Sequence, residues 1–277
     1  MADSPILSSV TNAVRVLKAF SAQKRSFGVS ELARKLELST STTHRLLATL
    51  AAERMVEQHP ETGRYQLGLA VYDLMAATTE GFTLTEAVLP PMTVLRRRTG
   101  ETVQVAVLDR REVVYVERLE SPRSVRMFME IGRRNQAHCT GTGKALLAYL
   151  DPVVLDRTLD GWDLPAKTPK TFTDPDDLRS ELRATRTRGY ATNVEESEIG
   201  AVSVGAPLWD QTGSVVAAMS VAGPTERMLP ALSEIAHTVL EAAAVASRRL
   251  GHRSPIAGRP DLSRHRPDTT NQRALSR

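Results

Sequence analysis

Three consecutive helical patterns and a β-hairpin pattern, all within the first 70 residues, constrain the fold of this chain more than any other feature. Apolar residues at spacings of three and four predict a helix over residues 9–21. Ser30 and Ser39 each stand before a further helical pattern, at residues 31–36 and 40–50. Serine is a preferred N-cap because its hydroxyl accepts hydrogen bonds from the free N–H groups of the first turn. We therefore predict three short helices, with a tight turn between the second and the third.

The hairpin is predicted from two short alternating segments, 55–59 and 64–67, on either side of a turn that contains Pro60 and Gly63. Three helices followed by a hairpin form a winged helix-turn-helix, whose third helix enters the major groove of DNA. The side chains placed to contact DNA are Thr40, Ser41, Thr42, His44 and Arg45 on the third helix and Arg64 on the hairpin. The alternative is an ordinary three-helix cluster whose polar face meets only water.

The remainder of the chain predicts a second, larger domain. Alternating segments predict strands at 102–108, 112–118, 124–129, 190–194, 201–207 and 214–221. Helices are predicted at 69–79, 83–99 with an interruption at Pro90–Pro91, 143–150, 152–159, 175–188 and 226–250. Strands grouped around a helical middle indicate an α+β sheet with helices to one side. The parts expected are a winged helix-turn-helix at 8–68, a linker helix at 69–82, an α+β domain at 83–250 and a disordered basic tail at 251–277.

The formal net charge of +4 is concentrated at the C-terminus, so it does not by itself indicate a DNA-binding domain. The 277 residues include 36 Lys and Arg against 32 Asp and Glu. Residues 1–80 have a net charge of +1, residues 81–250 of −1 and residues 251–277 of +4. Such a tail would add a non-specific, salt-sensitive attraction to DNA. Specific recognition must then come from a few basic side chains at defined positions.

Other features limit the compartment and the chemistry. Cys139 is the only cysteine, which excludes a disulfide framework and a cysteine-built zinc site and suits a reducing compartment. Met1–Pro5 has no basic segment before an apolar core, and no apolar run approaches the about 18 residues of a membrane span. The histidines have no metal-ligand spacing. We expect a cytoplasmic protein with no membrane partner, cofactor or metal.

The segment Thr140–Ala145 has the glycines of a phosphate loop but lacks the rest of its pattern. A P-loop requires glycine at position 138, which is His138, and a dinucleotide fingerprint requires glycine at position 146, which is Leu146. A glycine-rich turn that runs into a helix still leaves N–H groups free at the positive end of the helix dipole. The segment therefore predicts either a site for a carboxylate or an ordinary helix start.

No group of residues predicts catalysis. His138 and Cys139 are neighbours in sequence, and such neighbours seldom face each other in extended backbone. No further histidine or acid stands at an informative spacing from them. Glu195, Glu196 and Glu198 predict a solvated strand end or an interface. The chain is therefore not expected to be an enzyme.

Seven segments of the chain, taken together, carry a resemblance to a known family. They are Ser30–Ala33, Ser39–Leu50, Pro60–Gly68, Thr99–Thr102, Val113–Val116, His138–Ala145 and Arg188–Ala191. These segments closely resemble the IclR family of bacterial transcriptional regulators, and the resemblance is collinear over residues 8–250. It implies a winged helix-turn-helix, a linker helix and a GAF-like effector-binding domain. It also implies a homodimer or homotetramer on a palindromic operator of double-stranded DNA.

The resemblance also implies where an effector binds. In members that bind small carboxylates, the acid group lies at the glycine-rich helix start, which is Gly141 and Thr142 here. Polar partners correspond by position to Asn193 and Ser203, where the family has an aspartate and a cysteine. Lining positions correspond to Ser124, Met127, Asn135 and Ala201. Asn193 lacks the family's charge and polar side chains replace two leucines, so the pocket is expected to be roomier and more polar than in glyoxylate or pyruvate binders.

The function predicted is a transcriptional regulator whose effector, a small aromatic or hydroxylated organic acid, shifts it between DNA-competent and DNA-incompetent arrangements. Repression is more common in the family than activation, so a repressor is expected. The alternatives are an effector-dependent activator, an enzyme tethered to DNA, and a DNA-binding protein whose pocket has lost its ligand. Thr43, where the family usually has valine, is expected to donate its hydroxyl to the carbonyl of Ser39.

Overall fold

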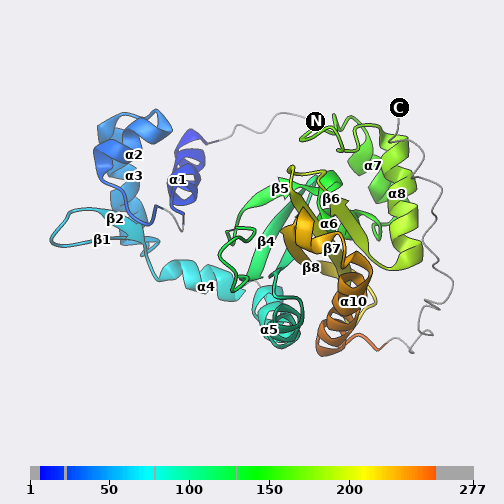
Figure 1. The fold of residues 1–277 in the computed structure, drawn as a ribbon. Coiled ribbons are helices and arrows are strands. Elements are labelled where there is room, and N and C mark those ends of the chain that lie inside the picture. Colours follow the sequence, from blue (N-terminus) through cyan, green and yellow to red (C-terminus); the bar gives the residue numbers. More distant parts are fainter. Residues whose placement is uncertain (1–6, 22–23, 78, 129, 254–277) are drawn as a thin grey trace. The chain divides into compact units, whose positions relative to one another are not determined.

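The computed structural model describes residues 7–21, 24–77, 79–128 and 130–253 (Figure 1). The chain divides into two compact units between Thr83 and Leu84. The division lies next to residue 83, the predicted start of the α+β domain. No helix in this described part of the chain is both long enough and apolar enough to cross a bilayer.

The N-terminal unit is the predicted winged helix-turn-helix. Its elements are α1 (Ser8–Ala19), α2 (Val29–Leu36), α3 (Thr40–Ala52), β1 (Val56–Gln58), β2 (Tyr65–Leu67) and α4 (Ala70–Ala77). Val16, Leu32 and Leu47, one from each of the first three helices, are fully buried together, and Val56 of the hairpin joins them. The backbone of Phe27 also pairs with Tyr65, which fixes the hairpin to the segment before α2. The predicted pattern of three helices and a hairpin is confirmed.

One helix start is as predicted and one is not. Ser39 is the N-cap of α3, because its Oγ accepts from the N–H of Thr42 at 3.1 Å. The prediction that Ser30 caps the second helix is wrong, because α2 begins at Val29 with Gly28 as its N-cap. The Glu31 carboxylate accepts from the Gly28 N–H at 3.5 Å. That acid therefore fills the capping role one turn into the helix, and the helix starts two residues earlier than predicted.

The C-terminal unit is built on one antiparallel sheet. Its strands are β3 (Thr102–Asp109), β4 (Glu112–Leu119), β5 (Arg134–Gln136), β6 (Ala191–Val194), β7 (Ala201–Trp209) and β8 (Val215–Pro224). The six strands lie in the order β5-β4-β3-β8-β7-β6. The predicted strand at 124–129 is wrong, since β5 occupies the edge of β4 instead. Side chains hold that segment, as where Thr102 Oγ1 donates to the Met127 carbonyl at 3.1 Å.

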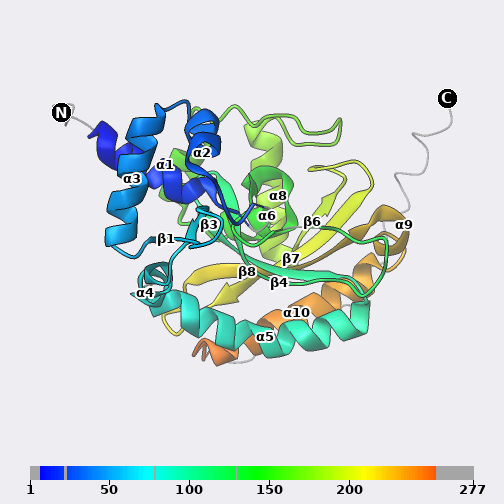
Figure 2. The same cartoon turned by 90° about the vertical axis from the view of Figure 1, so that its left-hand side faces the viewer.

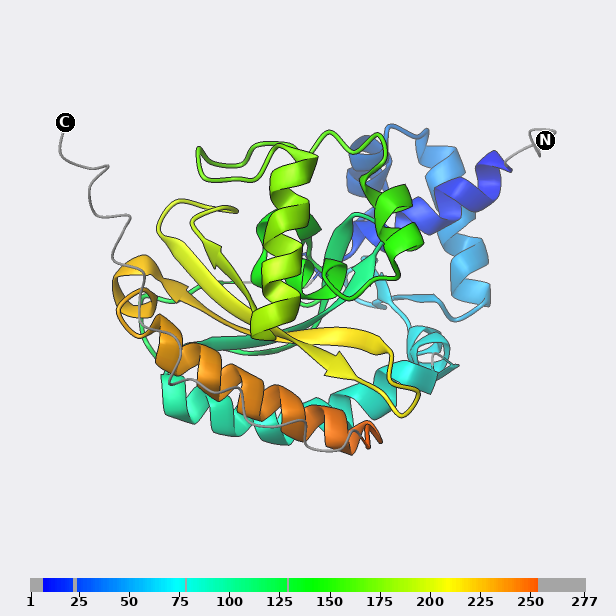
Figure 3. The ribbon, with the colours of Figure 1, turned by 90° about the vertical axis from the view of Figure 1, so that its right-hand side faces the viewer.

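Helices cover both faces of this sheet, not one as predicted (Figures 2 and 3). They are α5 (Thr79–Thr99), α6 (Gly141–Leu147), α7 (Pro152–Leu159), α8 (Pro175–Arg188), α9 (Thr225–Met228) and α10 (Leu232–Arg249), with a 3₁₀ turn at Ala137–Cys139. Val105 and Met219 point into a core with α5 and α10, whereas Ala106 and Ala218 point into a second core with α6, α7 and α8. Both faces of the central strands are apolar, so both must be covered. The α+β class is confirmed.

The long C-terminal helix predicted at 226–250 is in fact two helices, α9 and α10. Pro230 lies in the gap between them. Proline has no N–H to donate within a helix and its ring clashes with the preceding turn. The break therefore falls where the sequence contains its strongest helix breaker.

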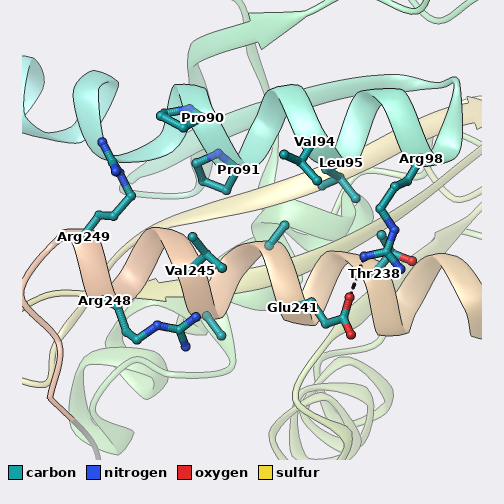
Figure 4. Close-up of a pocket in the computed structure, with 12 residues that line it drawn as sticks. Pro90, Pro91, Val94, Leu95, Arg98, Thr238, Glu241, Val245, Arg248 and Arg249 are labelled. Carbon is teal, nitrogen blue, oxygen red and sulfur yellow. Dashed lines mark hydrogen bonds and ion pairs between the residues drawn. The ribbon is translucent and has the colours of Figure 1, made fainter.

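Two other prolines do not break their helix, which corrects the predicted interruption at Pro90–Pro91. Both lie inside the continuous helix α5. Without N–H groups, they leave the carbonyls four residues earlier, those of Glu86 and Ala87, without helical partners. Arg249 of α10 supplies the missing donors, with Nη2 to the Glu86 carbonyl and Nε to the Ala87 carbonyl, both at 3.1 Å. Figure 4 shows Arg249 beside the two prolines, at one end of a groove between α5 and α10.

Residues 251 and 252, predicted to begin the disordered tail, pack against the C-terminal unit instead. The His252 ring stacks on Trp209 with ring centroids 5.8 Å apart, and its Nδ1 lies 3.2 Å from the Asp210 carbonyl. Gly251 forms a β-bridge with Asp210. Residues 251–252 therefore belong to the folded unit, and the predicted disorder of residues 254–277 lies outside the described residues.

Candidate functional sites

The first candidate site is the N-terminal half of α3. Thr40, Ser41, Thr42, His44 and Arg45 are all exposed on it, as predicted. The opposite face packs into the core through Leu47 and Leu50. Thr43 is buried with them, and its hydroxyl donates to the Ser39 carbonyl at 3.0 Å, which confirms the expected bond.

The hydroxyl groups at the start of α3 are ordered by the helix cap. Ser39 Oγ donates to Thr42 Oγ1 at 2.8 Å and lies 3.0 Å from Ser41 Oγ. Arg45, one turn further along, has no side-chain hydrogen bond or ion pair within the described residues. Its guanidinium is therefore free to bind a base edge or a phosphate, the two partners that arginine most often has on DNA.

Arg64 has a different environment from the other predicted DNA contacts. Its Nη2 donates to the Ser26 carbonyl at 2.9 Å and to Glu31 Oε2 at 2.7 Å, and its Nε donates to Ser26 Oγ at 3.1 Å. Lys24 also contacts Glu31, and these two cations lower the pKa of Glu31 to about 2. The structure thus places Arg64 in a contact that ties the hairpin to α2, with its side chain 39% exposed.

The second candidate site is a cavity of about 230 Å³ in the C-terminal unit. Five of the predicted effector-binding residues line it: Met127, Asn135, Asn193, Ala201 and Ser203. Gly141 and Thr142 do not line the cavity and lie buried at the start of α6, while Ser124 is exposed and does not line it. The cavity is smaller than the about 300–1,000 Å³ of pockets for drug-sized ligands, so it suits a small molecule.

The sheet supplies the floor of the cavity, because side chains two residues apart on a strand share a face. In one row across the strands, Ala222, Ser203 and Asn193 are register neighbours on β8, β7 and β6. In the next row, Gln104 of β3 lies opposite Ser220 of β8. Strand β3 is distant in sequence from β6, β7 and β8, and the register of the sheet brings its Gln104 to the polar groups of the other three.

Small residues let α6 approach this floor closely. A Cβ on Gly205 of β7 would stand 2.6 Å from the carbonyl carbon of Gly141. The Gly141 N–H donates to Ser203 Oγ at 3.3 Å, and Thr140 Oγ1 caps the helix by accepting from the Gly143 N–H at 3.1 Å. The helix starts at Gly141, two residues before the predicted start. Close packing of α6 against β7 thus requires glycine at position 205, and a Cβ on Gly141 would itself stand 3.2 Å from the Gly205 nitrogen, whether or not a ligand also binds there.

Asn193 is engaged with the backbone of the loop that follows β6. Its Oδ1 accepts from the Glu196 N–H at 2.7 Å, and its Nδ2 donates to Ser197 Oγ at 2.9 Å. Both Asn193 and Ser197 line the cavity. The carboxamide therefore shapes the cavity wall through the loop.

A buried ion pair holds the same loop to α6. Lys144, with no exposed surface, donates to both carboxylate oxygens of Glu196 at 2.7 Å and stands over the Phe172 ring. Burial raises the pKa of Glu196, and Lys144 opposes that shift. The prediction that Glu196 is solvated is wrong, because an acid can be buried when a partner charge lies beside it.

Several cavity residues have no counterpart among the predicted ones. The most polar are Gln104, Tyr115, Arg133, Lys167 and Glu198. Arg133 and Lys167 are exposed and bring positive charge to the lining. Burial raises the pKa of Tyr115, whose hydroxyl has Thr142 and Asn135 as polar neighbours. Only the alternation of side chains along a strand could have pointed to Gln104. Residues two apart share a face, so Gln104 lies on the same face of β3 as Ala106.

Nothing among the described residues forms a catalytic or metal-binding group. His138 Nε2 lies 3.2 Å from the Pro165 carbonyl, and the ring meets Trp162 edge-on. Burial raises the pKa of Cys139 to about 11, which disfavours the reactive thiolate. In the described ranges, no three His, Cys, Asp or Glu side chains gather to hold a metal ion.

Comparison with known proteins matches both units to one family. The profile described as "IclR helix-turn-helix domain" matches residues 9–60, and "Bacterial transcriptional regulator IclR C-terminal" matches residues 76–248. The transcriptional regulator XynR of Escherichia coli is 34% identical, over 90% of this chain and 99% of XynR. The transcriptional repressor AllR of Escherichia coli is 34% identical, over 78% of this chain and 79% of AllR.

A solved structure extends the match to the fold over most of the chain. The IclR homologue of Microbacterium hydrocarbonoxydans, complexed with 4-hydroxybenzoate, gives a TM-score of 0.78 at 28% identity, over 88% of this chain and 99% of that one. The names of the relatives are those of transcriptional regulators and not of enzymes. This chain belongs to the IclR family of bacterial transcriptional regulators.

Proposed function

We propose that this protein is a cytoplasmic repressor that binds a palindromic operator as a homodimer or homotetramer and responds to a small organic acid. The observation that carries the DNA-binding part is the exposed N-terminal face of α3, where Arg45 has no partner within the described residues. The repressor AllR among its relatives supports the sign of regulation. The DNA-contacting residues proposed are Thr40, Ser41, Thr42, His44 and Arg45, with Arg64 as a hairpin contact to the backbone.

Substitution of Arg45 tests the recognition surface. Arg45→Ala is expected to weaken operator binding by about 1–3 kcal/mol and to leave binding to scrambled DNA nearly unchanged, because a base contact carries sequence information. The control is Arg54→Asn, which removes a charge beyond the end of α3 at a φ of +58° that Asn tolerates. Fluorescence anisotropy with both DNAs measures the two affinities. Equal losses on operator and scrambled DNA would assign Arg45 to a phosphate, and no loss would remove it from the interface.

The effector part of the proposal is supported by the cavity. It is small, is lined by the predicted Asn135, Asn193 and Ser203, and includes two cations, Arg133 and Lys167, against one acid, Glu198, an excess of positive charge that favours an anionic ligand. The 4-hydroxybenzoate in the Microbacterium structure is a small acid of this class. A ligand alters DNA binding only if its affinity differs between the arrangements that bind and do not bind the operator.

A screen of organic acids tests the effector. An acid that binds this cavity is expected to raise the Tm of the protein and to change its operator affinity. Lys167→Met, which removes a lining cation, is expected to weaken that response, while Lys170→Met, an exposed lysine paired with Glu195, is the control. A screen without any hit would favour a pocket that has lost its ligand. An acid that strengthens operator binding would contradict simple induction of a repressor.

A further inference from the structure

One wall of the cavity is a segment that belongs to no strand or helix. Residues 121–128, here called the strap, follow β4 and bring Met127 and Phe128 to the lining. Within the described part of the chain, the strap makes no hydrogen bond between backbone groups. The cavity floor, by contrast, lies on a sheet that pairs continuously from β3 through β8 and β7 to β6. Side chains therefore hold the strap in its place.

A buried carboxylate just before β3 makes the first attachment. Glu101, whose side chain is 3% exposed, accepts from Arg227 Nε at 2.6 Å, from Arg227 Nη2 at 2.9 Å and from Arg123 Nη1 at 2.9 Å. Arg123 belongs to the strap, and Arg227 of α9 also donates from Nη2 to the Val125 carbonyl at 2.8 Å. A Cβ on Gly223 would stand 2.8 Å from Glu101 Oε2, so glycine there leaves room for the carboxylate. Hydrogen bonds between charged groups are the stronger kind, and this acid is shielded from water.

The second attachment lies at the next residue, Thr102, which is fully buried. Its Oγ1 accepts from the Ser121 N–H at 3.3 Å and donates to the Met127 carbonyl at 3.1 Å. One hydroxyl therefore ties the beginning of the strap to a residue near its end. Because Met127 lines the cavity, this bond acts directly on the cavity wall.

We propose that Glu101, Arg227 and Thr102 are positioning residues of the effector cavity, which hold the strap as a wall and so determine how readily a small molecule enters. None of the three is itself part of the lining, so they act through Met127 and Phe128. A segment without a backbone ladder opens at a smaller free energy than the sheet beneath it. The inference rests on the proposed function, because it concerns the same cavity.

Cys139 makes opening of the cavity measurable without knowledge of the effector. It lines the cavity, is 2% exposed and is the only cysteine of the chain. A thiol with so little exposed surface reacts with iodoacetamide through open states of the protein. The charged groups that shift the pKa of Cys139 are Glu196, Lys167 and Lys144, so loss of Arg227 alters access to the thiol and not its charged surroundings.

The rate of Cys139 alkylation by iodoacetamide, measured by mass spectrometry on the full-length protein, tests the inference. Arg227→Met removes three hydrogen bonds, and Thr102→Val removes a hydroxyl while keeping the branched shape. Each should raise the rate at least about threefold, which is a low value for the effect of one lost hydrogen bond on an equilibrium. The control is Arg249→Ala, which also loses two bonds to carbonyls, but those of α5 and not of the strap. It should change the rate by less than about threefold, because it lowers stability without releasing the strap.

The outcomes distinguish the strap from general stability and from the effector. A rise below about threefold in either variant overturns the inference, and if Arg227→Met does not fold, Thr102→Val alone decides. A comparable rise in Arg249→Ala also overturns it, because the thiol would then be reached by unfolding of the whole unit. The acid screen depends on none of these rates. A hit in that screen with unchanged alkylation overturns this inference alone, whereas faster alkylation without any hit supports the strap and contradicts the effector.

Discussion

At the scale of single residues, the contacts that hold the two candidate sites are of two kinds: those between residues close in sequence, and those that the fold brings together from distant parts of a unit. Ser39 and Thr43 could be placed because a cap and its return bond are local, within four residues. Arg64 could not, because its partners Ser26 and Glu31 are brought to it by the hairpin. The buried pair of Lys144 and Glu196 likewise depends on contacts across 52 residues of sequence. Charge in a sequence gives no indication of burial when the neutralising partner is distant.

The burial of His138 predicts how the stability of the protein depends on pH. Its ring has no exposed surface, and burial lowers its pKa from the ordinary 6.5, with the charges of Lys167 and Lys144 adding to the effect. Below pH 6.5 the unfolded chain takes up a proton that the folded chain does not, so the free energy of unfolding falls as pH decreases, by at most about 1.4 kcal/mol per pH unit. His138→Phe removes this pH-dependent part of the free energy of unfolding.

Thermal unfolding between pH 5 and pH 8 checks the sign. The difference in Tm between the unmodified protein and His138→Phe should be constant above about pH 7 and should move in favour of the variant as pH falls through the region below 6.5. His59→Gln, at an exposed position of the hairpin, is the control. A difference that stays constant over the whole range would contradict the buried, neutral state of His138.

At the scale of elements, boundaries were predictable where the local chemistry is strong. Helix α8 has the predicted bounds because Asp174 caps it, Pro175 is its first residue and Gly189 ends it at a φ of +83°. The prediction of a strand at 124–129 is wrong because a strand also needs the free edge of a neighbouring strand to pair with. The alternation of side chains does not show whether such an edge is available. Gln104 on the cavity floor was missed for a related reason, because the pattern of one strand does not show how β3 pairs with β8.

The two prolines of helix α5 predict that Arg249 contributes to the stability of the C-terminal unit. Arg249 donates to both carbonyls freed by Pro90 and Pro91, so Arg249→Ala should lower the free energy of unfolding by about 1 kcal/mol. Arg248→Ala is the matched control, because Arg248 lines the same groove without a side-chain hydrogen bond in the described part of the chain (Figure 4). Urea unfolding of both variants measures the difference. Equal stability of the two would show that water satisfies these carbonyls as well as the guanidinium does.

At the scale of the whole molecule, the charge distribution predicts how operator binding depends on salt concentration. Residues 254–277 contain five Arg and two Asp, so their removal lowers the formal net charge from +4 to +1. Truncation after Arg253 keeps His252 on Trp209. Operator specificity should survive, and the slope of log affinity against log salt should become shallower by at least about 1, the contribution of one phosphate contact. An unchanged slope would exclude these residues from contact with DNA, and a loss of specificity would give them a role in recognition.

The family and the α+β class were predictable because sequence motifs and periodic patterns occur along residues 8–250, whereas the coverage of both sheet faces depends on packing. One consequence of that packing concerns Cys139, the single cysteine, which lines the cavity and whose pKa is raised to about 11. At pH 7 very little of the thiol is then the thiolate that reacts with an alkylating reagent. We expect its modification to be slow in the protein without ligand, and slower still if a ligand binds in the cavity and covers it. The rate of Cys139 alkylation, measured by mass spectrometry, therefore reports whether the cavity is occupied, without an introduced probe.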